Sequence, residues 1–434
     1  MSTLLFRLKK ILPPWLIDII RPPYHFGLVW LGNILYKNPS KDITVIAVTG
    51  TKGKSTTVEL IATILEASGK KVASLSTIQF KIDNDIRPNL YKMTTPGRLF
   101  VQKFLREAVD ANCQYAVLEM TSEGAKQFRH KFIELDALIF TNLSPEHIES
   151  HGSFEKYKQA KLEIAKQLEV SHKKPRYIVA NADDEYGKEF LNTKVEKQLP
   201  YSLSNLKLYT LHKDGVALIY NNEDGGEITI RIQLVGLFNV YNALAAISIT
   251  RAMGVSWQVI ERALSNLQKI PGRVEHITSP KDSGKQITAI VDYAHTPDSL
   301  EKFYQAFKGV HKVCVLGNTG GGRDKWKRPE MASTAEKYCD HIILTNEDPY
   351  DEDPRQIVEE MACGIRDKNK VDVIMDRRIA IREAIDKAPD GSYVLISGKG
   401  TDPYIMGPNG TKEKWSDAEV VKEELELLRN ENLL

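Results

Sequence analysis

The loop at residues 49–56 carries the clearest chemical pattern in the sequence. Gly50 and Gly53 can turn backbone N–H groups toward one centre, and Lys54 can reach a terminal phosphate there. The Ser55 hydroxyl can bind a metal ion beside that phosphate. The alternative is a tight turn with a chance lysine. We expect a bound nucleotide, contacted in this loop by Gly50, Thr51, Lys52, Gly53, Lys54, Ser55 and Thr56.

A carboxylate and two histidines follow later apolar runs and can complete a metal site. Glu119 ends one such run, where it can reach a metal beside the loop, although a helix cap or a solvated acid is the alternative. His147 and His151 follow the next run. Pro145 and Gly152 argue against the continuous helix that a His-x-x-x-His zinc site needs. Oxygen ligands with one imidazole fit Mg²⁺ or Mn²⁺ better.

Polar residues further along the chain suit contacts with a nucleotide. Asn239 opens a helix after a glycine turn, and Asp292 closes a strand, where it can bond a ribose hydroxyl. Arg273 lies in a Pro-Gly-Arg turn and suits a phosphoryl oxygen. The glycine-rich loop 317–325 lacks the Gly-Lys-Ser ending, so we interpret it as an anion or carboxylate nest, with a flexible loop as the alternative. The stretch 397–402 ends the last strand in similar style.

The elements that must position these residues alternate between strand and helix. The first set predicts a parallel sheet with helices on both faces, whose ligand site lies at the carboxyl ends of the strands. Its strands are expected at 43–48, 71–76, 115–120, 136–141 and 176–180, and its clearest helices at 55–68, 97–111 and 153–169.

A change of pattern follows at residues 206–235. Short alternating runs joined by Lys-Asp-Gly and Asn-Asn-Glu-Asp-Gly-Gly predict an antiparallel appendage to the first domain. Helices at 239–252 and 256–268 come next. From residue 287 a second alternating set predicts strands at 287–292, 312–317, 341–345, 371–375 and 393–397, with helices at 297–308, 329–339, 354–366, 377–387 and 415–430.

The predicted fold class is therefore α/β. A central P-loop domain with a doubly wound parallel sheet and a small antiparallel appendage is followed by a C-terminal Rossmann-like α/β domain. The length of 434 residues suggests three units. We expect a short N-terminal helical segment at 1–42, the ATP-binding domain at 43–280 and the C-terminal domain at 281–434.

Charge and cysteine content exclude some function classes. The formal net charge is +2, from 59 basic and 57 acidic side chains, so no broad cationic face for nucleic acid is expected. The four cysteines form no C-x-x-C pair, and we expect structural thiols in a reducing cytoplasm rather than disulfides or zinc ligands.

The N-terminal runs 4–20 and 24–36 are apolar and are accompanied by the cations Arg7, Lys9, Lys10 and Arg21. Pro13-Pro14 and Pro22-Pro23 are expected to break them, so that no run reaches the length of a membrane span. A signal peptide is also a poor match. We favour two short helices packed on the body over a peripheral contact with a membrane.

The order of short motifs over residues 43–434 resembles the Mur ligase family, the ATP-dependent amino-acid ligases of peptidoglycan precursor synthesis. The match is nearest to the branch that adds the third peptide residue, the UDP-N-acetylmuramoyl-dipeptide:amino-acid ligases. The matching motifs stand at 49–55, 93–96, 119–122, 141–152, 157–161, 238–242, 271–275, 292–297 and 398–400.

The resemblance implies a carboxylate activated by ATP as an acyl phosphate, which an amine then attacks. Lys54 would hold the transferring phosphoryl group, with Mg²⁺ held by Ser55, Glu119 and His147. By composition alone Lys161 is a solvated lysine, but it matches the family lysine that is carbamylated and then binds metal. The residues expected around the nucleotide are Asn239, Arg273, Asp292 and His295.

Two further groups of residues match substrate positions of the family. Residues expected to hold the muramyl-peptide acceptor are Thr94, Thr95, Thr121, Gln127 and Arg129. Residues expected around the incoming amino acid are Arg323, Asp348, Gly398 and Asp402.

The sequence departs from the family at both substrate ends. About 42 residues precede the first strand, where the family has a uridine-diphosphate-binding domain, so the anchor is rudimentary or the acceptor differs, for example a lipid-linked muramyl peptide. Diaminopimelate-type enzymes carry Asp-Asn-Pro-Arg where this chain has Glu347-Asp-Pro-Tyr350. A phenol cannot pair with the distal carboxylate as arginine does, which leaves lysine or another amino acid open.

The rivals to this reading are a folylpolyglutamate synthetase-like ligase, whose loop also contains Thr-Lys-Gly-Lys, and a nucleotide-dependent scaffolding protein. The first would want glycine between Lys54 and Ser55, and the second is hard to reconcile with both Lys161 and Glu119. The expected partners are ATP, an amino acid and a UDP-muramyl peptide, without nucleic acid. A cytoplasmic monomer is expected.

Overall fold

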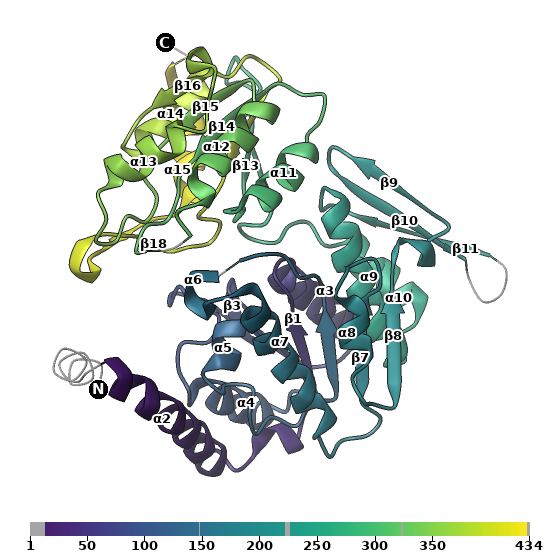
Figure 1. The fold of residues 1–434 in the computed structure, drawn as a ribbon. Coiled ribbons are helices and arrows are strands. Elements are labelled where there is room, and N and C mark those ends of the chain that lie inside the picture. Colours follow the sequence, from purple (N-terminus) through teal and green to yellow (C-terminus); the bar gives the residue numbers. More distant parts are fainter. Residues whose placement is uncertain (1–13, 147, 222–225, 323, 432–434) are drawn as a thin grey trace. The chain divides into compact units, whose positions relative to one another are not determined.

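The computed structural model describes residues 14–146, 148–221, 226–322 and 324–431 (Figure 1). The chain divides into two compact units. The first comprises residues 1–144, 155–202 and 244–256, and the second comprises residues 145–154, 203–243 and 257–434. The predicted boundaries after residues 42 and 280 stay predictions, since compactness alone divides the chain at other points.

The first unit is built on an eight-stranded sheet. Across the sheet its strands are β4 (Asp85–Pro88), β3 (Gln79–Ile82), β2 (Val72–Leu75), β5 (Tyr115–Glu119), β1 (Thr44–Thr49), β6 (Ala137–Phe140), β7 (Tyr177–Asn181) and β8 (Lys197–Tyr201). Six neighbouring strands, β2, β5, β1, β6, β7 and β8, run parallel to one another, whereas β3 and β4 pair antiparallel at one side of the sheet. β1 lies between β5 and β6, so the residues that follow these three strands meet at one edge.

The helices of the first unit follow the predicted periodicity closely. α3 (Lys54–Ala67) buries Val58, Ile61 and Leu65, and Gly53 caps its N-terminus with φ 82°, a left-handed conformation that glycine adopts readily. The others are α2 (Pro14–Leu35), α4 (Phe100–Asp110), α5 (Ser122–Lys126), α7 (Phe154–Glu169) and α8 (Gly187–Leu191).

The prediction of two short helices broken at Pro22-Pro23 is wrong. One helix continues through Pro22 and Pro23, because both prolines lie on its exposed side, where water can bond the carbonyl groups that the missing N–H groups leave unpaired. Within the described residues, every helix is too short or too polar to cross a bilayer.

A three-stranded antiparallel sheet and a short helix precede the C-terminal sheet in the second unit. The predicted hairpins are confirmed as β9 (Leu208–His212), β10 (Gly215–Asn221) and β11 (Glu227–Ile232). α6 (Ile148–His151) belongs to this unit, as does α10 (Trp257–Ser265), and α9 (Leu237–Ala252) is shared between the units. The 3₁₀ turns of the chain are η1 (Pro39–Lys41), η2 (Leu203–Asn205), η3 (Lys368–Lys370) and η4 (Pro408–Gly410).

The C-terminal sheet has six strands, all parallel except for its first. Across the sheet they are β12 (Glu275–Thr278), β13 (Thr288–Val291), β17 (Tyr393–Ile396), β14 (Lys312–Leu316), β15 (His341–Leu344) and β16 (Val371–Val373). Its helices are α11 (Pro297–Gln305), α12 (Lys327–Tyr338), α13 (Pro354–Ala362), α14 (Arg377–Lys387) and α15 (Asp417–Glu431). A hairpin of β18 (Tyr404–Met406) and β19 (Lys412–Lys414) completes the unit.

Two buried clusters form the core of this sheet, one on each face. The first packs α11, α12 and α13 against side chains such as Cys314 and Leu395. The second packs α14 and α15 against their strand neighbours, such as Val315 and Ile396. Successive residues of one strand thus belong to opposite clusters, because side chains along a strand point alternately to the two faces of the sheet. A sheet covered on both faces needs apolar residues at both sets of positions. The predicted α/β class is thus confirmed.

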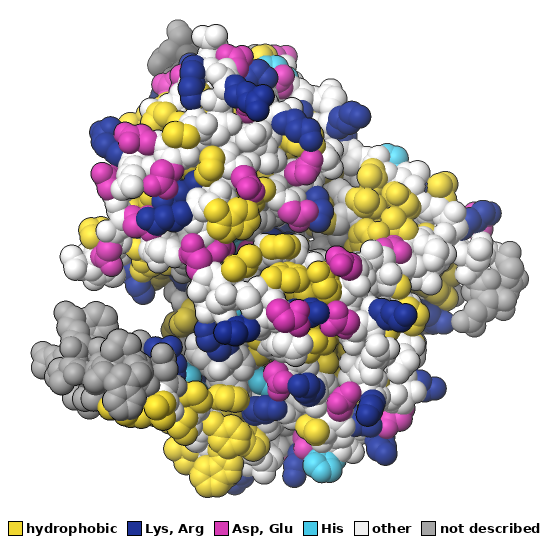
Figure 2. Space-filling view, viewed as in Figure 1, with side chains coloured by type: hydrophobic (Ala, Val, Ile, Leu, Met, Phe, Trp, Pro, Cys, Tyr) yellow, Lys and Arg dark blue, Asp and Glu magenta, His cyan; other side chains and the backbone are white. Residues whose placement is uncertain are grey.

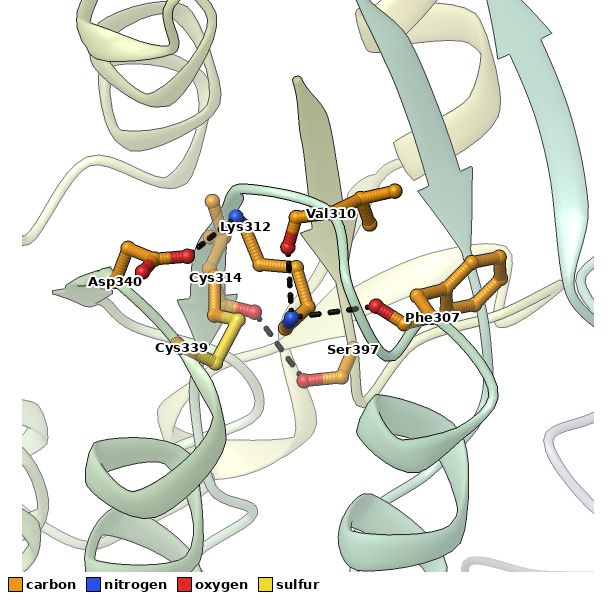
Figure 3. The surroundings of a disulfide bond; sticks show 8 residues. Phe307, Val310, Lys312, Cys314, Cys339, Asp340 and Ser397 are labelled. Atoms are coloured by element: carbon orange, nitrogen blue, oxygen red, sulfur yellow. Dashed lines mark hydrogen bonds between the residues drawn. A yellow bond between two sulfur atoms is a disulfide. The ribbon is translucent and has the colours of Figure 1, made fainter. Parts of the chain in front are cut away.

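The expectation that all four cysteines are thiols is wrong for two of them, which form a disulfide. Cys314 in β14 is bonded to Cys339, the residue that ends α12, with their Cα atoms 6.1 Å apart (Figure 3). Beside it, Lys312 donates its backbone N–H to Asp340 and its Nζ to the Val310 carbonyl. The pairing arises because α12 packs on the sheet and returns the chain to β15 beside β14, a proximity that spacing alone does not reveal.

Candidate functional site

The phosphate loop is held by the residues that follow β6. Thr51 donates its N–H to the Asn142 carbonyl at 2.8 Å, and Lys52 donates its N–H to Asn142 Oδ1 at 2.9 Å. Gly50 has φ 146°, and a Cβ there would overlap the Thr141 hydroxyl. Glycine is therefore required for the loop to pass this close to Thr141. Asn142 belongs to a motif of the sequence but was not among the predicted site residues.

Lys54, Ser55 and Glu119 come together as predicted from their places at strand and helix ends. Ser55 donates its hydroxyl to Glu119 Oε2 at 2.7 Å, and Lys54 Nζ lies 4.0 Å from Glu119 Oε1. Glu119 is 3% exposed. The helix cap and solvated acid considered for this residue are both wrong.

The fit of this cluster to a divalent cation rests on its donor atoms. Hydroxyl and carboxylate oxygens are the hard donors that Mg²⁺ prefers, so Ser55 and Glu119 fit that ion. Within the described ranges, His, Cys, Asp and Glu do not gather in threes that could hold a metal. The third predicted ligand, His147, lies outside the described residues.

Thr77 connects this cluster to the predicted acceptor residues and was missed from the sequence. It donates its N–H to Glu119 Oε2 at 2.9 Å, and its hydroxyl lies 3.1 Å from Glu119 Oε1 and 2.9 Å from Thr94 Oγ1. Thr77 follows β2, which pairs with β5. The rule that ligands gather at the carboxyl ends of parallel strands could have found it.

Lys161 is buried beside the phosphate loop. It is 1% exposed, its Nζ donates to the Gly50 carbonyl at 2.6 Å, and it lies 4.7 Å from the centre of the Tyr157 ring. Tyr157 in turn hydrogen-bonds Thr51 through its hydroxyl at 3.0 Å. The solvated lysine indicated by composition is wrong, and the motif match located the residue correctly beside the loop.

A pocket beside Glu119 is lined by several of the predicted acceptor residues. Thr95, Thr121 and Arg129 line it together with Glu119. Arg129 donates to Thr95 Oγ1 at 2.6 Å and to Gln127 Oε1 at 2.7 Å. Burial, with the charge of Arg98, lowers the Arg129 pKa to about 10. Arg129 therefore places a cation next to the predicted acceptor residues Thr95 and Gln127, which suits an anionic acceptor.

His130 lines the same pocket and was also missed. It is 3% exposed, and neither of its ring nitrogens has a hydrogen-bond partner within the described residues. Burial lowers its pKa to about 4, with a smaller contribution from the charge of Lys131. The imidazole is thus neutral near pH 7 and offers one donor and one acceptor. A single histidine in a mixed segment gave no signal in the sequence.

In the second unit, Arg273 and Asp292 lie on neighbouring backbone segments. Asp292 follows β13 and accepts the Val274 N–H at 2.9 Å and the Ala294 N–H at 2.7 Å. The Arg273 guanidinium stacks on Tyr293, 4.7 Å from the ring centre. Both predicted nucleotide contacts therefore lie at the carboxyl edge of the second sheet.

His295 and Asn239 are each held by hydrogen bonds within the second unit. His295 Nδ1 lies 2.6 Å from the Tyr293 carbonyl, and its Nε2 lies 3.1 Å from Glu146 Oε1. Asn239 donates to the Val235 carbonyl at 2.9 Å and accepts from Asn242 at 2.9 Å. Glu146 is a partner that the sequence did not indicate.

The residues predicted around the amino acid form a buried charged group. Lys399 pairs with Asp348 at 2.9 Å and lies 3.7 Å from Asp402. Gly398 has φ 106°, and a Cβ there would overlap the Glu347 carboxylate. Burial, with the charge of Asp348, raises the Glu347 pKa. Three predicted residues are thus gathered, while Arg323 lies outside the described residues.

Comparison with known proteins identifies two domain types. Residues 48–250 match the description "Mur ligase middle domain", and residues 272–400 match "Mur ligase, glutamate ligase domain". The UDP-N-acetylmuramoyl-L-alanyl-D-glutamate--2,6-diaminopimelate ligase of Syntrophomonas wolfei subsp. wolfei is 35% identical over 398 residues, which cover 89% of this chain and 79% of the relative.

Solved structures give the same result for the fold. A structure of a UDP-N-acetylmuramoyl-L-alanyl-D-glutamate--2,6-diaminopimelate ligase has a TM-score of 0.60 and 28% identity, covering 89% of this chain and 78% of that one. Mycobacterium tuberculosis folylpolyglutamate synthase has a TM-score of 0.68, covering 87% and 93%, but its 16% identity makes this a likeness of fold alone. With two matched domains and a relative at 35% identity over most of its length, the chain belongs to the Mur ligase family of ATP-dependent, amide-bond-forming ligases.

Proposed function

We propose that this ligase adds an amino acid, diaminopimelate, lysine or a similar one, to a UDP-N-acetylmuramoyl-dipeptide. The observation that carries the proposal is one chain of hydrogen bonds. It runs from Ser55 in the phosphate loop through Glu119 and Thr77 to Thr94, the first predicted acceptor residue. A phosphoryl group on the loop and an acceptor carboxylate near Thr94 would therefore face each other.

In the first step, an oxygen of the acceptor carboxylate bonds to the γ-phosphorus of ATP. The bond from phosphorus to the β–γ bridging oxygen breaks, and ADP leaves with that electron pair. Lys54 and the N–H groups of the loop offset the charge on the transferring phosphoryl oxygens. Arg129 orients the acceptor by pairing with one of its anionic groups, since its guanidinium lines the pocket beside Glu119.

In the second step, the amine nitrogen of the amino acid attacks the acyl carbon. Phosphate leaves with the electron pair of the carbon–oxygen bond, and the nitrogen loses a proton to form the amide. Asp348, Gly398, Asp402 and Arg323 would surround the amino acid. Tyr350 has φ 52° and packs against Gly321. It stands where the diaminopimelate-type enzymes of the family have an arginine that pairs with the distal carboxylate. The identity of the added amino acid is therefore a question for the substrate panel.

Mg²⁺ would be held by Ser55, Glu119 and His147, with Lys161 as a carbamate. When bound, the ion supplies positive charge to the phosphoryl oxygens. The burial of Lys161 Nζ beside the Gly50 carbonyl supports this proposed carbamate. Its neutral amine would attack CO₂ and release a proton, which exchanges a buried cation for a metal-binding anion. We place the reaction in the cytoplasm, where ATP is supplied.

The test is ADP release by the purified full chain with Mg²⁺. We expect release only when a UDP-muramyl dipeptide and an amino acid are both present, and a panel containing diaminopimelate and lysine identifies the amino acid. Glu119→Gln should reduce the rate at least about 100-fold, because it removes a charged ligand of the proposed metal ion beside the transferring phosphoryl group. Glu66→Gln is the control, since this carboxylate of α3 pairs with Lys81.

Two outcomes would overturn the proposal. One is ADP release driven by tetrahydrofolate with glutamate, which would favour a folylpolyglutamate synthetase-like ligase. The other is release with a lipid-linked muramyl peptide but not with the UDP-linked one. Absence of amino-acid-dependent ADP release with every acceptor would remove ligase activity on these substrates altogether.

A further inference from the structure

Helix α2 is fixed to the first unit by one face. His25, Val29 and Gly32 are buried along that face. Arg98 donates its Nε to His25 Nδ1 at 3.0 Å, and a Cβ on Gly32 would lie 2.8 Å from the Leu99 side chain. These contacts fix which face of the helix lies against the first unit. The residues on the opposite face are therefore fixed as well.

The opposite face is apolar and exposed. We call it the outer face of α2, and its large side chains are between 43% and 63% exposed. Figure 2 shows hydrophobic side chains gathered over this helix at the lower left of the view. Phe26, Trp30 and Ile34 follow each other at intervals of four residues, which places them in one line along a helix. The face consists of Ile19, Ile20, Phe26, Trp30, Leu31, Ile34 and Leu35.

Phe26 lies at the edge of this face, where its ring packs against Phe128 and Phe132, but the core of the first unit does not account for the other side chains. Scattered exposed apolar residues need no explanation, but seven large apolar side chains exposed on one helix form a contiguous patch, and such patches mark interaction sites. The stretch from Pro22 to Tyr36 contains no Asp, Glu, Lys or Arg. Whatever covers the outer face must therefore be apolar itself, as the acyl chains of a lipid bilayer are.

Cations flank the apolar stretch at both ends. Arg21 precedes it, Lys37 and Lys41 follow it, and all three are exposed. The sequence before the helix adds Arg7, Lys9 and Lys10. Apolar side chains, including a tryptophan, between exposed cations are typical of helices that lie in the surface of an anionic membrane.

The same charges argue against a second copy of the chain as the occupant. If two outer faces packed antiparallel, Arg21 of one copy would approach Lys37 of the other. If they packed parallel, each cation would meet its own counterpart. Like charges at such a contact oppose association. Lipid phosphates, by contrast, would pair with the cations at both ends.

We propose that the outer face of α2 binds the surface of a bilayer that contains anionic phospholipid. The helix lies parallel to the surface, with Trp30 and Ile34 among the acyl chains and Arg21 and Lys37 at the phosphates. This property goes beyond the proposed ligase reaction and does not depend on it.

The test is co-sedimentation of the full chain with vesicles of phosphatidylcholine, with and without phosphatidylglycerol. We expect binding to vesicles with phosphatidylglycerol that is about tenfold stronger than to phosphatidylcholine alone and that weakens with added salt. Trp30→Glu with Ile34→Glu should weaken binding at least about tenfold, since two charges would enter the apolar region. Val170→Glu with Val373→Glu is the matched control, because these valines are 63% and 53% exposed on other elements.

Retained binding by the Trp30→Glu, Ile34→Glu variant would overturn the proposal. Equal binding to both kinds of vesicle would also overturn it, since the cations would then contribute nothing. Light scattering gives a third check: a dimer that the same variant converts to a monomer would make the outer face a self-association surface. An unchanged melting temperature shows that the variant is folded, as expected for exposed positions.

Discussion

At the scale of the residue, burial determines what Lys161 can do. The Lys161 amine is 1% exposed, donates to the Gly50 carbonyl and lies over the Tyr157 ring. These contacts fix the amine beside the phosphate loop, where the proposed carbamate would form.

We predict that Lys161→Ala lowers the rate of ADP release at least about 100-fold, because a charged group at the phosphoryl-transfer site is lost. Formate or acetate should restore part of the rate by occupying the place of the carbamate. Lys166→Ala, on the exposed side of the same helix, is the control and should keep the full rate. A variant at Lys161 that retains normal activity would remove this residue from the site.

We predict that the buried His130 lowers the free energy of unfolding in acid. Its pKa is about 4 in the folded chain and 6.5 for an ordinary histidine, so the unfolded chain binds the proton more tightly. Its contribution to stability is complete above pH 6.5 and is lost as the pH falls toward 4. The loss amounts to roughly 3 kcal/mol.

The measurement is urea unfolding as a function of pH. His130→Leu should remove this part of the acid sensitivity, because leucine does not titrate. His212→Leu is the control and should leave it unchanged, since His212 is an exposed residue of β9. If both variants showed the same pH dependence as the original chain, His130 would not titrate as its burial implies.

At the scale of the element, two adjacent arginines of α14 show how burial changes an ion pair. Arg377 pairs with Asp417 at the start of α15 at 2.7 Å, and both side chains are 0% exposed. Arg378 pairs with Glu423 in α15, and these side chains are 45% and 57% exposed. Both pairs join the same two helices, but they differ in access to water, and Arg378 has a second ion pair with Glu424.

We predict that Asp417→Asn lowers the free energy of unfolding by about 3–5 kcal/mol, because it removes the direct ion-pair partner of the buried Arg377 charge. Glu423→Gln should cost less than about 1 kcal/mol, since water solvates the exposed arginine. Denaturant unfolding of the two variants measures the difference. Equal losses would mean that burial does not govern the strength of these pairs.

At the scale of the whole molecule, each compact unit has its own sheet and buried side chains. The disulfide between Cys314 and Cys339 lies wholly within the second unit and closes a separation of 25 residues. A crosslink of this length stabilises its unit by about 3 kcal/mol, mainly by restricting the unfolded chain.

We predict that Cys314→Ser with Cys339→Ser reduces hydrogen-exchange protection in β13, β14 and β17 while β1 and β5 keep theirs. Cys363→Ser is the control, because Cys363 is an exposed free cysteine. Equal loss of protection in both sheets would show that the two units unfold together rather than separately.

Much of the fold follows from local patterns. The parallel strands from β1 to β7 and the helices α3, α4 and α7 were predicted within a few residues, because period and strand-end motifs report which face of an element is buried. The edge strands β4, β8 and β12 and the neighbouring strand β3 were missed, since short strands that are partly exposed lack a strong apolar pattern.

The sequence by itself determined the α/β class, the phosphate loop and, through the order of its motifs, the family. These are properties of short segments, in which residue type and spacing carry the information. The tertiary structure alone decided that Thr77 joins Glu119 to Thr94, that Lys161 is buried, that Cys314 meets Cys339 and that α2 keeps an apolar face exposed. Each depends on which distant segments become neighbours, and packing between elements determines this.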